Sequence, residues 1–421
     1  MQKTLGSAVS IDRRRHTTVG GLGNGVKPVL ITREQRKDPA MGSHSTWSYV
    51  VFIVLVFSIA TDVSGQTAAI FDRVNAHEFH PLNEDGSFTS DRVLAKHGVS
   101  DLANDDWKVR LLAIRDLTRS LPQQLDAVVA GLEHNDPHVR QIAAAALGIA
   151  RQKEAASALQ RVLEADPMAL VRSQAAMSLG QLESVESLEL LRQFFERDKS
   201  RDVRHQCELA IDQIEKRLGA TEAQLAAFRA LDEASFEQVQ VGQLAPDFTL
   251  SDSEGNPWQL SRAGNGKWTV LIWIFADWCP VCHGEFKELM SMKKEFDEAN
   301  AVVATIECHD LYRCRLMVGK EKDAAYWFSK TSFQQKYLRS VWWPHLSDLA
   351  GRVGAQYGVD PMSFAVHAEY VNRPSTIIID PEGRVRLTYY GTFWGDRPSL
   401  HETLEMIKSE EFGFEHPRRL K

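Results

Sequence analysis

The sequence predicts a multidomain protein in which an all-α array of helical repeats precedes a domain of mixed α/β structure. Two observations predict this fold class. Between residues 102 and 218 a Val-Arg pair recurs with spacings of 30, 32 and 32 residues, a period typical of stacked helical hairpins. From residue 241 onward, apolar runs of strand length alternate with an amphipathic segment of helix length. The 421 residues are sufficient for both domains.

The composition is that of a globular protein, with 43% hydrophobic and 25% charged residues. Charge is distributed unevenly along the chain. Residues 1–65 contain eight Lys and Arg against four Asp and Glu, and the rest of the chain contains 41 against 52, a formal charge of −11. This acidic balance argues against a nucleic-acid partner. The five cysteines are too few for a disulfide-stapled scaffold.

A segment near the N-terminus predicts export. An apolar run of 12 residues, 49–60, fits the core of a signal peptide and is short for a spanning helix. Val63 and Gly65 stand where a cleavage site needs small residues, so we expect a mature chain that starts near Gln66. Uncleaved, segment 47–63 would be a marginal membrane anchor, and a buried core strand is the remaining alternative. We therefore expect a protein that is periplasmic, or anchored and facing the periplasm.

Each repeat carries one apolar helical face. A small side chain follows each Val by four residues, and Leu or Ile follows it by eight, which places all three on one side of a helix. The recurring residues are Val109, Val139, Val171 and Val203, then Ala113, Ala143, Ala175 and Cys207, then Leu117, Leu147, Leu179 and Ile211. We interpret Cys207 as a packing residue because it takes the position of the alanines. The segment resembles HEAT-like repeats, which implies a surface for a protein partner, and a structural spacer is the alternative.

The elements after residue 241 are predicted in a fixed order. Segment 268–275 is a continuous apolar run suited to a central strand, a helix follows the cysteines, and 301–307 forms another buried strand. Two further strands flank the turn at Pro381-Glu382-Gly383. We interpret 309–345 as a helical insertion. Strand, helix, strand and then an antiparallel pair is similar to a thioredoxin-type order.

The Cys-Pro-Val-Cys motif at 279–282, followed by His283, is compatible with three chemistries: a redox dithiol, half of a zinc site, or attachment of a c-type haem. A haem site needs a helix-borne motif that opens a helical pocket, whereas this motif ends a buried strand. A zinc site needs four ligands, and the spacing of Cys308 and Cys314 is poor for a zinc knuckle. We therefore predict a redox dithiol with no metal and no cofactor, and an exposed His283 in the first helical turn.

Four motifs of the second domain form a set. They are Pro246-Asp247-Phe248, Trp278-Cys279-Pro280-Val281-Cys282, the stretch SDLAGRVGAQYGV, and Arg373-Pro374-Ser375-Thr376. Jointly they resemble the redoxin group, which holds AhpC/TSA peroxiredoxins and TlpA-like exported thiol-disulfide oxidoreductases, over about residues 241–408. The resemblance implies a thioredoxin-like fold, a redox-active pair of cysteines beside Trp278, and a cis Pro374 that faces the pair and binds extended substrates.

The local physics of the motif also favours a reactive dithiol. Cys279 lies at a strand-to-helix junction with Pro280 at the first helical position, so its sulfur faces unsatisfied amides at the positive end of the helix dipole. This field lowers a thiol pKa, and the thiolate is the nucleophile. Cys282 follows one turn later, within disulfide reach. We predict Cys279 as the attacking thiolate and Cys282 as the resolving thiol.

A peroxidase is the principal alternative. Peroxiredoxins carry a Pro-x-x-x-Thr/Ser-x-x-Cys motif whose reactive cysteine corresponds to Cys282, and an Arg from a later strand. This sequence has Phe275 in place of the Pro, Cys279 in place of the Thr, and Pro374 in place of the Arg. These departures favour disulfide exchange. A non-enzymatic interaction protein is a second alternative, which the complete set of Trp278, Cys279, Cys282 and Pro374 disfavours.

Two further features bear on the redox site. Thioredoxins carry a buried Asp six residues before the first cysteine as a proton acceptor, where this sequence has Trp273, and Glu307 is the candidate substitute. For Cys308 and Cys314 we expect a structural disulfide, which an exported protein favours, with a second redox pair as the alternative.

We predict an exported thiol-disulfide oxidoreductase that acts on protein disulfides or dithiols, draws on an electron donor, and uses its array to bind a protein partner. The predicted parts are a basic leader with signal peptide or anchor at 1–65, an N-terminal linker at 66–101, HEAT-like repeats at 102–218, a helical connector at 219–240, a thioredoxin-like redoxin domain at 241–412 and a tail at 413–421.

Overall fold

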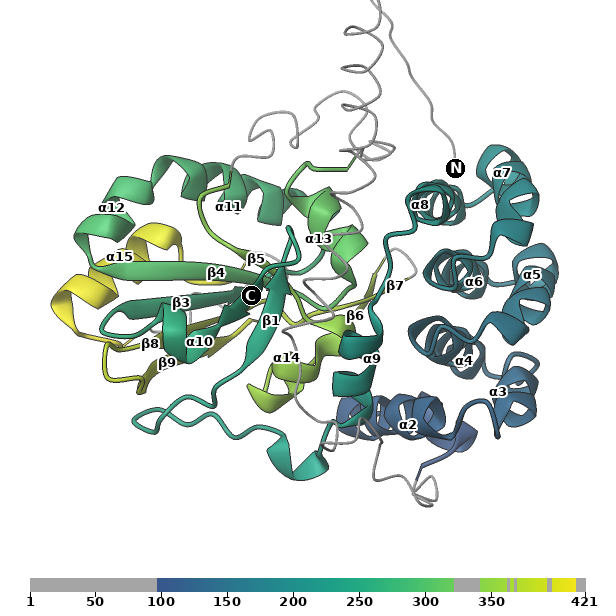
Figure 1. The fold of residues 1–421 in the computed structure, drawn as a ribbon, viewed down its shortest axis with the longest axis horizontal. Helices are drawn as coiled ribbons and strands as arrows, with labels where there is room; N and C mark the ends of the chain where they lie inside the picture. The colour runs from purple at the N-terminus through teal and green to yellow at the C-terminus, as the bar shows by residue number, and fades with distance from the viewer. Residues whose placement is uncertain (1–96, 322–340, 362–363, 367–368, 392–395, 414–421) are drawn as a thin grey trace, which may run out of the picture. The chain divides into compact units, whose positions relative to one another are not determined.

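The computed structural model describes residues 97–321, 341–361, 364–366, 369–391 and 396–413 (Figure 1). The predicted leader with its signal peptide or anchor, most of the predicted linker and nearly all of the predicted tail lie outside the described residues. Within the described part of the chain, no helix has both the length and the apolar character that a membrane span requires.

The first domain is an array of paired helices, as the repeat predicts. Its elements are η1 (Val99–Ala103), α2 (Trp107–Ser120), α3 (Leu125–Gly131), α4 (Pro137–Ile149), η2 (Lys153–Ala155), α5 (Ala156–Ala165), α6 (Ala169–Gln181), η3 (Val185–Ser187), α7 (Leu188–Arg197) and α8 (Arg201–Lys216). The helices that carry the Val-Arg pairs stack in chain order, because α4 packs between α2 and α6, and α6 packs on α8. The helices α3, α5 and α7 form a second rank beside them (Figure 1).

Small residues let the stacked helices approach closely. The recurring Ala113, Ala143, Ala175 and Cys207 are fully buried, as predicted for packing residues. Gly180 of α6 shows how tight the stacking is, because a Cβ at this position would lie 2.9 Å from the Cα of Ala210 on α8. No side chain fits there without movement of the backbone.

The Arg of the repeated pair ties one hairpin to the next. Arg140 donates Nε to Asp166 Oδ2 at 2.7 Å and Nη2 to Oδ1 at 3.0 Å. Arg172 makes the same two bonds to Asp198, at 2.8 and 2.9 Å. Both carboxylates belong to residues that end the outer helix of the pair. Bidentate Arg–carboxylate pairs fix geometry as well as adding energy, which explains why Arg recurs with the period of the repeat.

The second domain is built on a seven-stranded sheet with strand order β2-β1-β5-β4-β3-β8-β9. The strands are β1 (Thr249–Asp252), β2 (Pro257–Gln259), β3 (Trp268–Trp273), β4 (Ala301–Glu307), β5 (His345–Ser347), β8 (Ser375–Ile379) and β9 (Val385–Tyr390). The strand β3 pairs parallel with β4 and antiparallel with β8. All six residues of β3 are buried, as its continuous apolar sequence predicts.

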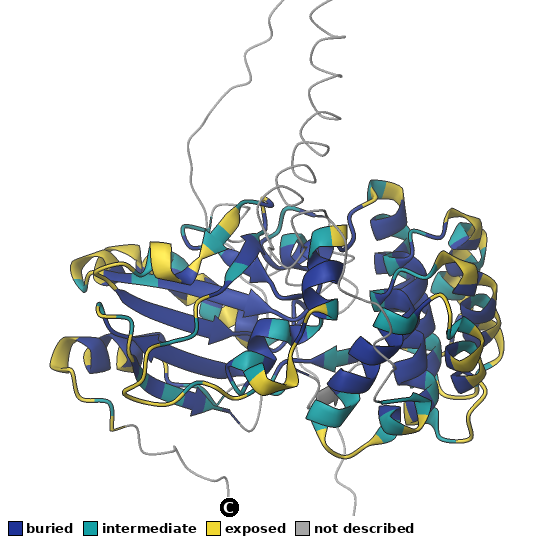
Figure 2. Ribbon diagram, turned by 60° about the horizontal axis from the view of Figure 1, so that its bottom comes forward, coloured by how far each residue is buried: buried dark blue, intermediate teal, exposed yellow. Residues whose placement is uncertain are grey.

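Helices cover both faces of this sheet. The remaining elements are α9 (Glu222–Arg229), η4 (Glu233–Ser235), α10 (Leu260–Ala263), α11 (Pro280–Ser291), α12 (Lys293–Glu298), α13 (Leu311–Met317), η6 (Leu349–Gly351), α14 (Arg352–Gln356) and α15 (Leu400–Ser409). On one face Val270 and Ile272 join a core with Phe286 of α11. On the other, Leu271 and Trp273 pack in a core with residues of α10 and α14. Figure 2 shows that the central strands are buried along their length.

The predicted fold class is confirmed: a helical repeat region is followed by a thioredoxin-like domain with the order β3, α11, β4 and an antiparallel β8–β9 pair. Two parts of it were not predicted in detail. A separate hairpin, β6 (Phe364–Val366) with β7 (Glu369–Val371), precedes β8. Within the predicted insertion the structure describes a short helix, α13, and residues 322–340 lie outside the described residues.

The last helix of the array contacts the second domain through polar side chains. Gln213 of α8 donates Nε2 to Asp310 Oδ2 at 2.8 Å, and Tyr312 of α13 donates its hydroxyl to Asp212 at 2.9 Å. Gln206 of α8 donates to Glu369 of β7 at 2.9 Å. These bonds join α8 to the elements that lie next to the redox motif.

Candidate redox site

The two cysteines of the motif lie where β3 passes into α11. Cys279 is the N-cap of α11, with Pro280 at its first position, and its sulfur accepts a hydrogen bond from Cys282 N at 3.4 Å. The sulfur of Cys282 accepts one from Phe275 N, also at 3.4 Å. The predicted strand-to-helix junction is therefore present: an amide of the first helical turn reaches the Cys279 sulfur, and an amide just after β3 reaches the Cys282 sulfur.

The electrostatics of the pair favour a thiolate at Cys282, whereas the sequence predicts one at Cys279. Both are fully buried. Burial, with the hydrogen bond and charge of Cys282, raises the pKa of Cys279 despite its position at the helix start. Burial opposes ionisation of Cys282 as well, but a hydrogen bond from Cys279 and the charge of Arg397 lower its pKa to about 7. The opposite directions of the two shifts favour Cys282 over Cys279 as the thiol that loses its proton first.

Arg397 is a site residue that the sequence analysis did not find. Its charge lowers the pKa of Cys282, and its guanidinium donates Nη1 to Trp273 O at 2.7 Å and Nη2 to Glu285 Oε2 at 2.5 Å. The side chain is 4% exposed. Peroxiredoxins place an Arg beside the reactive cysteine, and the sequence analysis expected none here because Pro374 stands at the corresponding position. A residue just before α15 supplies the guanidinium instead, and no local spacing in the sequence signals it.

Trp278 anchors the motif to the array side of the domain. Its indole Nε1 donates to Glu369 of β7. Arg313 of α13 holds the same carboxylate through Nη1 and Nη2, both at 3.0 Å, and donates Nε to Asp277 at 2.9 Å. Since Gln206 of α8 also donates to Glu369, a buried polar network runs from the array to the residue next to Cys279.

His283 is buried, contrary to the expectation of an exposed first-turn residue. It is 1% exposed, and its Nε2 lies 2.5 Å from Asp277 O. Burial lowers the pKa of His283 to about 4. The neutral ring therefore donates to the backbone and closes the loop between β3 and α11, and it does not supply a positive charge to the sulfurs.

Pro374 does not take the predicted cis form. Among the described residues the one cis peptide bond is Leu121–Pro122, so the bond before Pro374 is trans. The Pro374 carbonyl accepts a hydrogen bond from Gly391 N at 2.7 Å, while Arg373 donates Nε to Gly391 O at 2.7 Å. This pairing with the end of β9 fixes the backbone of the segment in the trans form.

The remaining redox expectations also change. All five cysteines lie within the described residues and are free thiols, so the expected Cys308–Cys314 disulfide is wrong for this structure. Cys314 faces Glu307 and His345, whereas Cys308 borders a different cavity with Leu349. Glu307, the candidate proton acceptor for the dithiol, instead contacts His309 and His345 at 2.9 and 3.1 Å.

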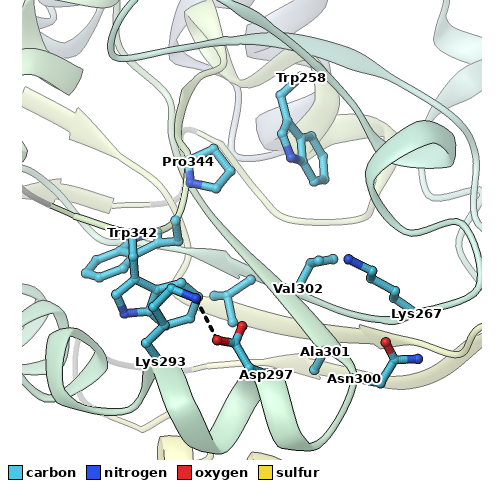
Figure 3. A pocket seen from close by; sticks show the side chains of 11 residues that line it. Trp258, Lys267, Lys293, Asp297, Asn300, Ala301, Val302, Trp342 and Pro344 are labelled. Atoms are coloured by element: carbon cyan, nitrogen blue, oxygen red, sulfur yellow. Dashed lines mark hydrogen bonds and ion pairs between the residues drawn. The ribbon is translucent and has the colours of Figure 1, made fainter.

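The redox pair does not line the cavity of about 250 Å³ that lies at the start of β4. Figure 3 shows Trp258, Trp342 and Pro344 around it, with Lys293 paired to Asp297 at 2.6 Å. The redox motif follows the end of β3, and β4 runs parallel to β3. This cavity lies at the start of β4, away from the two thiols.

Comparison with known proteins agrees with the two-domain fold. Residues 241–388 match the AhpC/TSA family. Residues 99–178 and 150–212 match HEAT repeats. The AhpC/TSA domain is 28% identical over 174 residues to chloroplastic peroxiredoxin Q of Sedum lineare, which covers 41% of this chain and 81% of that protein. It is 28% identical over 148 residues to alkyl hydroperoxide reductase E of Mycobacterium tuberculosis, covering 35% and 83%.

Among solved structures, peroxidoxin BcpB of Mycobacterium tuberculosis matches with a TM-score of 0.33 and 22% sequence identity, over 41% of this chain and 99% of that one. The AhpC/TSA domain thus has peroxiredoxins among its similar proteins, and the chain carries a redox domain of the thioredoxin fold.

Proposed function

We propose that this protein is a thiol peroxidase in which Cys282 attacks the peroxide and Cys279 resolves the product. The observation that carries the proposal is the environment of Cys282. Its sulfur has a lowered pKa beside Arg397, while Cys279 is a buried thiol with a raised pKa. A guanidinium next to a thiolate both stabilises the nucleophile and polarises a peroxide oxygen that approaches it.

Two of the three departures from the peroxiredoxin motif are compatible with this function. Cys279 stands in place of Thr, and its thiol donates a hydrogen bond to Cys282 as a hydroxyl would. Arg397 provides the guanidinium that position 374 lacks. The similarity of residues 241–388 to proteins named peroxiredoxin supports the same assignment.

The proposed reaction has three steps. The Cys282 thiolate attacks one oxygen of the hydroperoxide, an S–O bond forms and the O–O bond breaks, and the released alkoxide or hydroxide takes up a proton. Cys282 is then a sulfenic acid. Cys279 attacks the Cys282 sulfur, and its proton leaves with the hydroxyl group as water, which forms the Cys279–Cys282 disulfide. A dithiol donor returns both thiols by exchange.

Disulfide exchange initiated by Cys279 is the second candidate. The feature that favours it is the Cys-Pro-Val-Cys motif with Cys279 as the helix N-cap. A protein disulfide must reach the attacking sulfur, however, and Cys279 is fully buried while Val281, two residues later, is 40% exposed. A peroxide is small enough to require much less opening.

Trapping experiments on single variants separate the two candidates. We expect Cys279→Ser to react once with hydrogen peroxide and to accumulate a sulfenic acid on Cys282, detectable by mass spectrometry after dimedone labelling. Cys282→Ser should consume peroxide no faster than free cysteine and should form no mixed disulfide with a protein substrate. Mixed disulfides on Cys279 in Cys282→Ser, together with no sulfenic acid in Cys279→Ser, would establish disulfide exchange instead.

The array is proposed to bind the protein that donates electrons. Stacked repeats present an extended surface to partners, and two large apolar side chains are exposed on turns at opposite ends of α6, Met168 at 44% and Val185 at 58%. Replacing both by Asp should slow turnover with the natural donor and leave turnover with a small dithiol unchanged. Equal loss with both donors would mean that the array only supports the fold.

A further inference from the structure

A cluster of metal-binding atoms lies at the end of β4, apart from the two redox sulfurs. Glu307 ends β4 and contacts His309 Nδ1 through Oε1 at 2.9 Å and His345 Nε2 through Oε2 at 3.1 Å. Cys314 of α13 faces the same point, and its sulfur, a Glu307 oxygen and a His345 nitrogen all lie within 4.8 Å of one another. All four side chains are buried. His345 and Cys314 are fully buried, Glu307 is 1% exposed and His309 is 8% exposed.

The donor set and its spacing fit a small divalent ion. Zinc is bound in proteins by Cys, His and carboxylate groups in tetrahedral sites. Zinc lies about 2.0 Å from nitrogen and oxygen ligands, so two such ligands at a tetrahedral angle are about 3.3 Å apart. The separation of His345 Nε2 from Glu307 Oε2, 3.1 Å, is close to this value.

The imidazole of His345 is held from its other side, as metal-binding histidines usually are. Its Nδ1 bonds Thr305 Oγ1 at 2.9 Å, and Trp343 Nε1 donates to the same oxygen at 3.0 Å. The ring also packs edge-on against Phe286 of α11, with centroids 5.4 Å apart. These contacts direct Nε2 toward Glu307 and Cys314, and they place the cluster against the helix that carries the redox pair.

Buried carboxylates gather around the cluster, and one guanidinium serves two of them. Asp277, Glu307 and Glu369 are all buried, and Arg313 is the guanidinium that bonds Asp277 and Glu369. Glu307 has histidine partners instead. Burying more negative than positive charge is costly, and a cation at Glu307 would reduce that cost.

We propose that Cys314, His345 and Glu307 form a structural site for one zinc-class divalent ion, with His309 holding the other oxygen of Glu307. Binding would displace the thiol proton of Cys314 and the His345 imidazole proton directed at Glu307. The ion would then join β4, β5 and α13 through covalent-strength contacts in place of hydrogen bonds. The sequence analysis missed the site because it considered cysteine pairs alone, whereas these ligands come from three separate elements.

The test uses the full chain with Cys279→Ser and Cys282→Ser, so that the redox pair cannot bind the probe. Co²⁺ is added to the metal-free protein, because a cobalt–thiolate bond gives an intense near-ultraviolet absorption. We expect about one equivalent of Co²⁺ to bind with this absorption, and Zn²⁺ to displace it. Adding Cys314→Ser should remove the absorption, whereas Cys308→Ser, a buried thiol on the same segment outside the cluster, should retain it.

A second measurement does not depend on the folding of any Cys314 variant. X-ray absorption of the zinc-loaded double-serine protein should show one sulfur neighbour and nitrogen or oxygen neighbours. Failure to bind zinc or cobalt, retention of the absorption in the Cys314→Ser protein, or a zinc shell without sulfur would each overturn the proposal and leave a proton-linked His–Glu–His cluster. The peroxidase assignment does not depend on this outcome, because its site is absent from the test protein.

Discussion

Replacing Arg397 by Gln should raise the pKa of Cys282 and shift the pH dependence of the first oxidation step upward. The guanidinium is 4% exposed and its charge lowers the pKa of Cys282, so solvent screens the interaction weakly. Gln removes the charge and can still donate to the Trp273 carbonyl. The change therefore isolates the electrostatic contribution of Arg397 to thiolate formation.

The expected size follows from the pKa values. At a pKa of about 7, half of Cys282 is thiolate at pH 7, whereas the ordinary thiol value is 9.0. Arg397 shares the lowering with the Cys279 thiol, so its loss should raise the pKa by about one to two units. The thiolate fraction at pH 7 then falls roughly 5-fold to 50-fold. A more basic thiolate is also a stronger nucleophile, which offsets part of this loss. The oxidation rate at pH 7 should therefore fall by only about 2- to 6-fold.

The assay is the pH dependence of alkylation at Cys282, followed by peptide mass spectrometry on the reduced protein. The wild-type rate should rise through about pH 7, and the Arg397→Gln rate should rise about one to two units higher. Arg397→Lys keeps the charge and serves as the control, with a midpoint near the wild type. Since Gln leaves the Glu285 carboxylate unpaired, Arg397→Gln with Glu285→Gln provides a charge-neutral comparison. An unchanged midpoint in both Gln variants would refute the role assigned to Arg397.

Three further predictions follow from the same structure. The folded pKa of Cys282, about 7, lies below the ordinary 9.0, so the stabilisation that its ionisation contributes is complete above pH 9 and is lost as the pH falls through 7. The free energy of unfolding in urea should be measured for the reduced wild type and for Cys282→Ser. The difference between the two proteins should be larger at pH 9 than at pH 6 by about 2 to 3 kcal/mol. Glu369→Gln weakens the buried pair with Arg313 and should lower the free energy of unfolding by about 3 kcal/mol, whereas Arg192→Ala, which breaks an exposed pair, should cost less than about 1 kcal/mol; equal losses would contradict the importance of burial. N-terminal sequencing of exported protein should start near Gln66, and intact chains in the cytosol would argue against the signal peptide.

The sequence by itself determined the features that depend on neighbours along the chain. The Val-Arg period predicted the stacked helices. The spacing of four residues within each helix predicted the burial of Cys207, because it places Cys207 on the apolar face. The apolar run of β3 followed by Cys279 and Pro280 predicted the strand, the turn and the helix N-cap. These patterns are local, so no knowledge of the folded chain is needed to recognise them.

The tertiary structure decided which residue acts on which. The charge on the redox pair depends on Arg397, which follows Cys282 by more than a hundred residues, and on burial, which outweighs the helix dipole at Cys279. Likewise His345 meets Glu307 only because β5 lies beside β4 in the sheet. A pKa depends on desolvation and on charges within a few ångströms, and the sequence does not specify either until the strands and helices are assembled.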